Sequence, residues 1–425
     1  MDRTKAPEFR TIEKIEIPHA EKHSLDNGIE VYSINAGSQE LTKIEFLFKA
    51  GMYYQDRPLM AATTNSLLET GTKKYTADQL SDEIDFFGSF FECSVGQDYS
   101  SVVLYSLNKY LENTIGYVED ILKNATFPQN EFDIYISNKK QKFLVNTQKV
   151  NVIARRRFGE LIFGEKHPYG IDVKLEDYDK LKRDDVVGFY QSTYNSSNCA
   201  IIVSGNIPSS LIKVLNEHFG KQAWGSKEKV SKGYIAPAPS SQQKHFIERA
   251  DAIQSALRVG RLLFNKKHED YFTFQVLNTI LGGYFGSRLM ANIREDKGYT
   301  YGIGSGVSSL VNGGYFYIST EVGADVTGSA LEEIYKEIKI LRDVAVPEEE
   351  LETVRNYILG QFLRSVDGPF SLADKFKGIW EFGLDYDYYQ RYFDVVKHVT
   401  PAQLQEAANK YLQEKDLLEL VVGKK

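Results

Sequence analysis

Hydrophobic and polar positions along the chain of 425 residues repeat one plan twice. Each half opens with an alternating, half-buried strand, continues with a strand pair around a tight turn, and ends in an amphipathic helix followed by an apolar strand. These elements are predicted at residues 41–50, 91–107, 186–194 and 198–205 in the first half and at 255–264, 301–322, 402–411 and 416–423 in the second. A repeat of domain length indicates duplication, since solenoid units are much shorter.

Long helical patterns and one polar stretch complete the outline. Helices are predicted at residues 111–123, 131–147, 326–343 and 348–366. Residues 225–243 are rich in Lys, Ser, Pro and Gln, and Pro237 and Pro239 oppose regular structure, so this stretch is expected to be a linker. We therefore predict an α+β fold with two homologous domains, residues 1–224 and 244–425. Each is expected to be a largely antiparallel sheet with helices packed on one face, the two domains facing each other like a clam shell.

Composition limits the classes of partner and compartment. Hydrophobic residues at 42% and charged residues at 26% are typical of a soluble globular protein. A net charge of −7 argues against a nucleic-acid partner, which needs a basic face. Two cysteines favour a reducing compartment, and no apolar run predicts a membrane span. Met1–Pro7 lacks the apolar core of a signal peptide, so a cytoplasmic location is expected, or a periplasmic one if a signal was removed.

Two segments carry the candidate chemistry. Residues 59–72 join a helical pattern to a short apolar run and Gly71–Thr72. Residues 282–301 begin with GGYFGSRL and end with an arginine and a tyrosine seven residues apart. Together the two segments resemble the pitrilysin family of metallopeptidases, the inverzincins. The resemblance extends from about residue 23 to residue 423.

In that family the first segment carries His-x-x-Glu-His, in which the histidines bind zinc and the glutamate is the general base; a glutamate on a following helix is the third ligand. The resemblance places Ala62, Asn65 and Ser66 at the motif positions and Lys142 at the distal glutamate. An alanine has no donor atom, an asparagine cannot accept a proton at neutral pH, a serine is a poor zinc ligand, and a lysine repels the metal. No histidine occurs between residues 23 and 167. We therefore expect this chain to bind no metal and no other cofactor.

Other histidines are weaker candidates. His19 and His23 stand four residues apart, a spacing that two ligands on a helix could use. They follow Pro18 and precede a predicted turn and strand, so an exposed arm is favoured over a metal site. His167, in the sequence His-Pro-Tyr-Gly, matches a turn of the family and is expected to be structural.

The second segment matches the family motif that faces the zinc. By resemblance, Arg294 holds the substrate backbone and Tyr301 donates to the oxyanion of the tetrahedral intermediate, and both donate without losing a proton at neutral pH. The alternative is that Arg294 forms a structural salt bridge and Tyr301 begins a strand, with Arg288 as a candidate anchor for the helix. The resemblance also places Glu92 and Cys93 on an edge strand that binds substrate, where the family has Asn and Ala.

Loss of the zinc residues beside a preserved Arg/Tyr pair resembles the non-catalytic chain of two-chain, processing-peptidase-like members of the family. We expect a non-catalytic subunit of a heterodimeric zinc metallo-endopeptidase, inactive alone, that supplies Arg294 and Tyr301 in trans. The expected partner is a homologue with an intact His-x-x-Glu-His that holds the zinc, and the expected substrate is a peptide. A peptide-binding or structural scaffold of the same fold is the alternative, and a zinc site built from substitute ligands is disfavoured.

Overall fold

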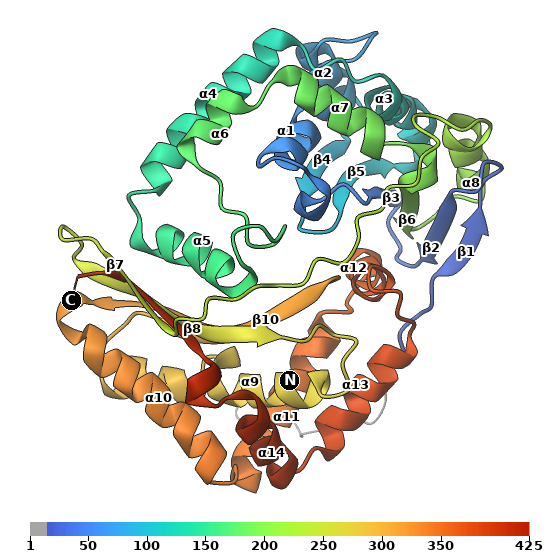
Figure 1. Ribbon diagram of the computed structural model, residues 1–425. Coiled ribbons are helices and arrows are strands. Elements are labelled where there is room, and N and C mark those ends of the chain that lie inside the picture. The colour runs from blue at the N-terminus through green and yellow to red at the C-terminus, as the bar shows by residue number, and fades with distance from the viewer. Residues whose placement is uncertain (1–14, 425) are drawn as a thin grey trace, which may run out of the picture.

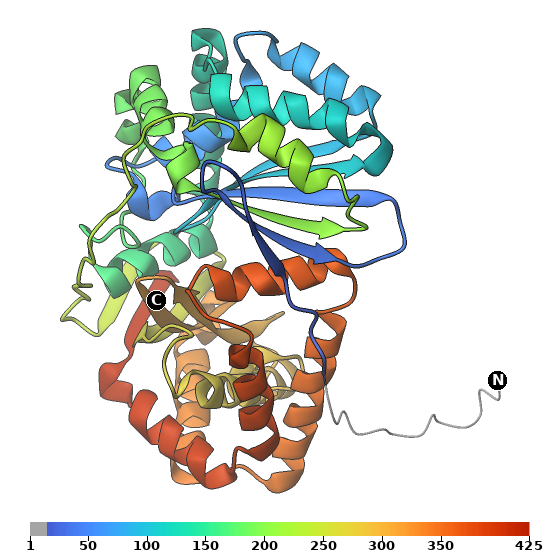
Figure 2. The same cartoon turned by 90° about the vertical axis from the view of Figure 1, so that its right-hand side faces the viewer.

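The computed structural model describes residues 15–424. Met1–Pro7, the stretch that bears on a signal peptide, lies outside the described residues. Two β-sheets with helices packed against them make up the molecule, and in Figure 1 the sheet of the first half lies above that of the second. Figure 2 shows the same two layers from the side. Between residues 15 and 424, no helix is long and apolar enough to cross a membrane.

The sheet of the first half has six strands in the order β1-β2-β6-β3-β5-β4. These are β1 (Glu21–Ser24), β2 (Glu30–Asn35), β3 (Leu41–Phe48), β4 (Phe90–Val95), β5 (Ser100–Leu107) and β6 (Cys199–Gly205). Neighbouring strands are antiparallel except β2 and β6, which are parallel. β6 is buried along its whole length, as expected for a strand covered on both faces. β4 forms one edge of the sheet.

The second half repeats this arrangement with five strands in the order β7-β11-β8-β10-β9. These are β7 (Lys244–Glu248), β8 (Gln254–Leu263), β9 (Ile303–Leu310), β10 (Gly313–Gly323) and β11 (Leu418–Gly423). Only β7 and β11 pair in parallel among these strands. The predicted hairpin is present as β9 and β10, joined through the turn that contains Asn312. Residues 225–243 contain no helix and no strand, as predicted.

Helices cover the outer face of each sheet (Figure 1). The first half contains α1 (Met60–Leu67), α2 (Ala77–Phe86), α3 (Leu111–Asn124), α4 (Gln129–Asn146), α5 (Val150–Phe163), α6 (Leu175–Lys180), α7 (Arg183–Thr193) and α8 (Leu211–Leu215). The second half contains α9 (Tyr271–Asn278), α10 (Thr327–Asp343), α11 (Glu348–Arg364), α12 (Pro369–Trp380), α13 (Asp387–His398) and α14 (Pro401–Tyr411). Three π-helical segments are η5 (Asn216–Gly220), η6 (Thr279–Gly283) and η7 (Met290–Asp296). Capping boxes at Thr76 and Thr400 fix the starts of α2 and α14.

The two halves exchange helices. α5, from the first half, packs on β8 and β11 of the second sheet, where Phe158 and Phe163 lie fully buried in one cluster with Leu420 and Val422. α12, from the second half, packs on β2 and β6 of the first sheet. Each inner sheet face is therefore covered by a helix of the other half, and the exchange joins the halves through apolar surface.

A buried polar junction adds to this contact. The carboxylate of Asp98, in the turn between β4 and β5, accepts hydrogen bonds from the Tyr169 hydroxyl and from the backbone N–H of Val311, at 3.1 Å for the latter. The N–H of Asn312 donates to the Tyr169 oxygen at 3.2 Å. Burial raises the pKa of Asp98 above its ordinary value. The hairpin turns of the two halves thus meet at one carboxylate.

The predicted α+β class with two mostly antiparallel sheets is confirmed. The division into domains at residues 1–224 and 244–425 stays a prediction, since α5 and α12 pack across it.

Candidate functional site

The first candidate segment forms α1, a buried helix of eight residues. Asn65 lies fully buried, and its side-chain amide donates to the backbone oxygen of Ser101 and to the hydroxyl of Tyr194, both at 3.2 Å. Ser66 is partly buried and accepts a hydrogen bond from Tyr135 at 3.1 Å. Both polar side chains therefore have hydrogen-bond partners within the protein.

The helix α4 also contacts α1, and its Tyr135 hydrogen-bonds to Ser66. The Tyr135 hydroxyl also reaches the backbone oxygen of Ala62 at 3.5 Å. Lys142, placed at the distal-glutamate position by counting along the sequence, is exposed and lies about two turns further along the same helix. Tyr135 is a residue of this site that the sequence did not reveal. The assignment of Lys142 stays a prediction that the contacts of α1 do not support.

A zinc ion does not fit the residues that stand here. Ala62 contributes no side-chain donor, and the Asn65 and Ser66 side chains already have protein partners. No group of three or more His, Cys, Asp or Glu side chains that could hold a metal occurs among residues 15–424. We derive no catalytic step through a metal bound to this chain.

The second candidate segment lies in the second half of the chain and is anchored by Arg288. Its guanidinium makes a two-point contact with Glu350 of α11, Nε to Oε1 at 2.9 Å and Nη2 to Oε2 at 2.7 Å. Bidentate pairs of this kind fix geometry as well as contribute energy. The predicted anchoring role of Arg288 thus has a structural basis in this pair.

Arg294 lies in η7, and its guanidinium carbon stands 4.7 Å from the ring centroid of Phe285. Phe285 is 62% exposed, so the arginine is held by an aromatic side chain at the surface. Across residues 15–424, no ion pair or hydrogen bond engages its side chain, which speaks against the structural salt bridge. Phe285 is a second residue missed from the sequence, although it belongs to the glycine-rich motif itself.

Tyr301 precedes β9 and is 95% exposed. It borders a cavity of about 300 Å³ whose other walls include Arg258, Thr320 and Glu321 of the second sheet and Asn151 of α5. Its hydroxyl, like the Arg294 side chain, has no hydrogen-bond partner within the described part of the chain. No hydrogen bond or cation–π contact in that part joins Arg294 to Tyr301. The motif therefore presents two separate, unoccupied donors.

The edge strand β4 places Glu92 and Cys93 on opposite faces, as alternation requires. Glu92 is exposed, whereas Cys93 packs against the core of the first half. Burial raises the pKa of the Cys93 thiol, and the negative charges of Glu69 and Glu92 raise it further. The thiol is therefore protonated near neutral pH and is not a nucleophile.

The histidines have structural surroundings. His19 stacks on Tyr386 with ring centroids 4.0 Å apart, and His23 lies in β1, not on a helix, with Nε2 3.0 Å from the Ser33 hydroxyl. His167 is buried; its Nδ1 accepts from the N–H of Tyr169 at 3.1 Å. The Nε2 atom lies 3.0 Å from the Ile235 oxygen, so this ring ties residues 225–243 to the first half.

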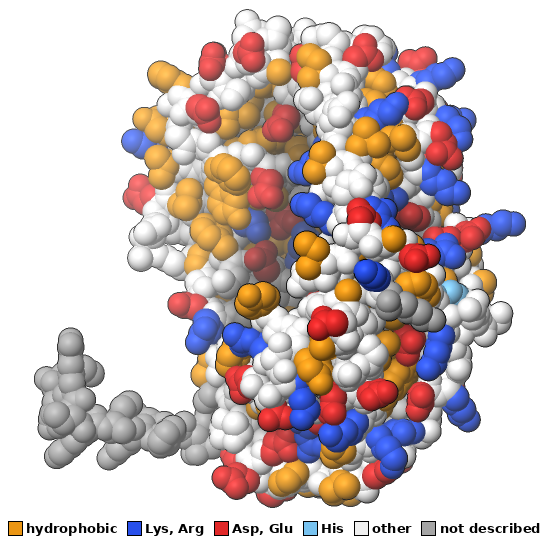
Figure 3. Space-filling model, turned by 90° about the vertical axis from the view of Figure 1, so that its left-hand side faces the viewer, with side chains coloured by type: hydrophobic (Ala, Val, Ile, Leu, Met, Phe, Trp, Pro, Cys, Tyr) orange, Lys and Arg blue, Asp and Glu red, His pale blue; other side chains and the backbone are white. Residues whose placement is uncertain are grey.

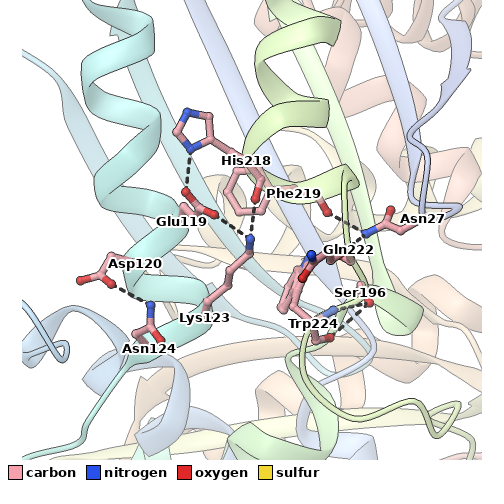
Figure 4. A network of polar contacts seen from close by, with 10 residues as sticks. All are labelled: Asn27, Glu119, Asp120, Lys123, Asn124, Ser196, His218, Phe219, Gln222 and Trp224. Atoms are coloured by element: carbon pink, nitrogen blue, oxygen red, sulfur yellow. Dashed lines mark hydrogen bonds and ion pairs between the residues drawn. The ribbon is translucent and has the colours of Figure 1, made fainter.

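One further polar network involves a histidine. Figure 4 shows His218 of η5 with Nδ1 2.7 Å from Glu119 of α3, while Lys123 of α3 contacts the same carboxylate at 2.7 Å and the backbone oxygen of His218. Asn27 donates to the backbone oxygens of Phe219 and Gln222 in the same region. These contacts fasten η5 and the chain that follows it to the first half, and we assign them a structural role.

Residues 180–358 match the family described as peptidase M16 inactive domain. The chain is 26% identical to an uncharacterized zinc protease of Rickettsia bellii over 346 residues, which are 79% of this chain and 81% of that protein. A peptidase M16 inactive domain from Pseudomonas fluorescens has the same fold, with a TM-score of 0.84 and 20% identity over 96% of this chain and 98% of that one. A protease from Helicobacter pylori superposes with a TM-score of 0.86 and 17% identity over 96% and 100% of the two chains.

Proposed function

Residues 180–358 belong to the peptidase M16 inactive-domain family, and from this premise we propose that the chain is the non-catalytic subunit of a two-chain zinc endopeptidase. The partner is a homologue with an intact His-x-x-Glu-His and its zinc. This chain supplies Arg294 and Tyr301 to the partner's site, where a peptide is hydrolysed. By itself the chain has no hydrolytic activity.

The observation that carries the proposal is the contrast between the two segments. At α1 the polar side chains of Asn65 and Ser66 are bound by the protein's own groups. At the second segment, no hydrogen bond among residues 15–424 engages the side chain of Arg294 or Tyr301, and Tyr301 is exposed beside a cavity. A hydroxyl whose role is to stabilise this fold would be expected to be buried and hydrogen-bonded within it.

The chemistry fits a split site. In the partner, zinc and the glutamate would activate the attacking water. A phenol donates a hydrogen bond to the oxyanion that forms at the attacked carbonyl, and a guanidinium donates to a neighbouring backbone oxygen of the substrate. Both groups act without changing their own protonation state, so they can be delivered by a separate chain.

Copurification and mixing test the proposal. The tagged chain is captured from its native cell, the stoichiometric partner is identified by mass spectrometry, and hydrolysis of a quenched fluorescent peptide is measured for each chain and for the mixture. The proposal expects a partner of similar size with His-x-x-Glu-His and hydrolysis that requires both chains. Recovery of partners without that motif would support a peptide-binding or structural scaffold instead.

A variant distinguishes the supplied donors from a merely structural subunit. Arg294→Ala should lower turnover of the mixture while the two chains still copurify, because the side chain makes no ion pair with any of residues 15–424. Turnover equal to that of the wild-type mixture would contradict the proposed role of this residue.

A further inference from the structure

A second cavity, of about 560 Å³, lies between α4, α5, residues 170–173 and the hairpin of β9 and β10. This volume is within the range of small-molecule and peptide side-chain pockets. Figure 3, which views the molecule from the side where α4 and α6 lie in Figure 1, shows a hollow bordered by basic and acidic side chains. The cavity's own lining is strongly biased to one sign, with four cations and one carboxylate.

Three of the four cations lack a counter-charge. Lys139, Lys142 and Arg155 are exposed at the cavity, and within residues 15–424 no carboxylate pairs with any of them. Lys139 instead stands 4.9 Å from the ring centroid of Tyr135. The fourth cation, Arg156, is paired with the lone carboxylate, Asp172, at 2.6 Å. In a chain of net charge −7, this excess of positive charge is local to the cavity.

The wall beneath these cations is aromatic. Phe143 and Tyr178 lie with ring centroids 5.3 Å apart, and Phe163 and Tyr315 pack edge to face at 5.7 Å. The guanidinium of Arg156 stands 4.6 Å from the Phe143 ring, which fixes that wall. Aromatic walls of this kind accept a large apolar side chain, while the unpaired cations accept a carboxylate beside it.

The helix α5 borders both this cavity and the cavity of Tyr301. Asn151 and Ala154 of α5 border the cavity of Tyr301, whereas Arg155 borders this one. A peptide lying along α5 can therefore occupy both. This argument does not favour a second copy of the chain or a nucleic acid as the ligand of this cavity.

We propose that this cavity binds an acidic peptide segment, with a carboxylate between Lys142 and Arg155 and a neighbouring apolar side chain on the wall of Phe143 and Tyr315. The inference deepens the proposed function, on which it rests for the identity of the peptide as substrate. Peptides with Glu or Asp next to a large apolar residue are the class of substrate that it selects.

Binding to the purified chain alone tests this inference. Short acetylated and amidated peptides with the core Leu-Glu-Glu or Leu-Gln-Gln are titrated and followed by fluorescence anisotropy at low and at physiological salt. The Leu-Glu-Glu peptide should bind about tenfold more tightly, and the difference should shrink as salt screens the charges. A Leu-Gln-Gln peptide with a free C-terminus shows whether a terminal carboxylate serves as well as a side chain.

Charge-reversal variants locate the site. The double variant Lys142→Glu and Arg155→Glu should remove the preference for the acidic peptide, and the milder Lys142→Gln and Arg155→Gln pair should reduce it in the same direction. Lys221→Glu, at an exposed lysine next to η5, is the matched control and should leave the preference unchanged. Circular dichroism checks that each variant is folded.

Three results would overturn the inference: equal affinity for the acidic and amide peptides, an unchanged preference in the double variant, or equally tight binding of a single-stranded oligonucleotide. Because these measurements need no partner, they are independent of hydrolysis. A mixture that hydrolyses peptides without preferring acidic ones would sink this inference and leave the proposed function standing. A chain that binds acidic peptides but yields no active mixture would support this inference and contradict the proposed function.

Discussion

Replacing Glu45 by glutamine should weaken the attachment of the exchanged helix α12. Glu45 lies buried on β3, with Oε1 2.5 Å from Lys377 of α12 and Oε2 3.3 Å from Lys43. Lys43, itself buried, also contacts Asp374 of α12 at 3.1 Å. Two chain segments more than three hundred residues apart are therefore joined through one carboxylate.

The expected loss in the free energy of unfolding depends on which charged groups lose a partner in Glu45→Gln. Removing one member of a buried ion pair costs about 3–5 kcal/mol, since the other charge is left buried and unpaired. Lys43 keeps Asp374, so the main loss falls on Lys377, which is only partly buried. We therefore expect the free energy of unfolding to fall by about 3 kcal/mol, the lower end of that range.

The pH dependence gives a second, independent signature. Burial raises the pKa of Glu45, but the charges of Lys377 and Lys43 outweigh burial and leave that pKa below its ordinary value of 4.5. A carboxyl whose pKa is lower in the folded state stabilises that state above its unfolded pKa, and the contribution disappears as pH falls through the folded value. The difference in stability between wild type and Glu45→Gln should therefore be full at neutral pH and shrink in acid.

Urea denaturation at several pH values measures the difference, and hydrogen exchange of the α12 amides shows where it acts. Asp343→Asn, which breaks the exposed pair with Lys339, is the control and should cost less than about 1 kcal/mol. An equal loss in both variants, or a Glu45→Gln loss that does not change with pH, would refute the reasoning.

Three further changes have definite outcomes. Gly51→Ala would put a Cβ 2.5 Å from the carbonyl carbon of Asp98, so thermal melting should show a loss of about 1–3 kcal/mol; an unchanged melting temperature would mean that the turn can move. Burial lowers the pKa of His167, partly offset by its backbone hydrogen bond, so the folded state loses stability as pH falls below about 6.5 and this group is protonated in the unfolded chain. His167→Gln should therefore flatten the decline in the free energy of unfolding from about pH 7 to 5. An unaltered slope would contradict this assignment. Arg288→Ala leaves the partly buried Glu350 unpaired and should cost about 1.5–3 kcal/mol in urea denaturation, which a loss below about 0.5 kcal/mol would contradict.

Much of the fold was predictable because its signals are local. The helices predicted at residues 111–123 and 348–366 are α3 and α11, and the alternating strands predicted at 41–50 and 255–264 are β3 and β8. Periodicity identifies such elements because each buries one stripe or face. The predicted resemblance to the pitrilysin-type peptidases is confirmed by the family match over residues 180–358.

The exchange of helices was not predictable. The sequence of α5 shows which of its residues are apolar, but no pattern shows that Phe158 and Phe163 are buried on the sheet of the other half. The same holds for α12 on the first sheet. A buried stripe reports that a helix has a partner and not which partner it has.

The sequence predicted which residue types occupy the candidate site better than it predicted which residues they contact. Counting from the motif indicated that Asn65 and Ser66 replace zinc-site residues, but not that Tyr135 binds Ser66, because counting across a loop cannot fix the facing residue of α4. By resemblance, Arg294 and Tyr301 were expected to form a pair that faces the zinc. In the structure η7 ends at Asp296, and Tyr301 lies outside it in the segment that leads to β9.

The most direct test of the proposed function is the turnover number of the reconstituted two-chain complex carrying Tyr301→Phe. The change removes only a hydroxyl on a side chain that is 95% exposed, so the unfolding free energy and copurification of the partner should be unaffected. If the hydroxyl donates to the oxyanion in trans, the turnover number should fall by about 10²–10³-fold, with little change in KM. A complex of Tyr301→Phe that turns over substrate at the wild-type rate would contradict the account.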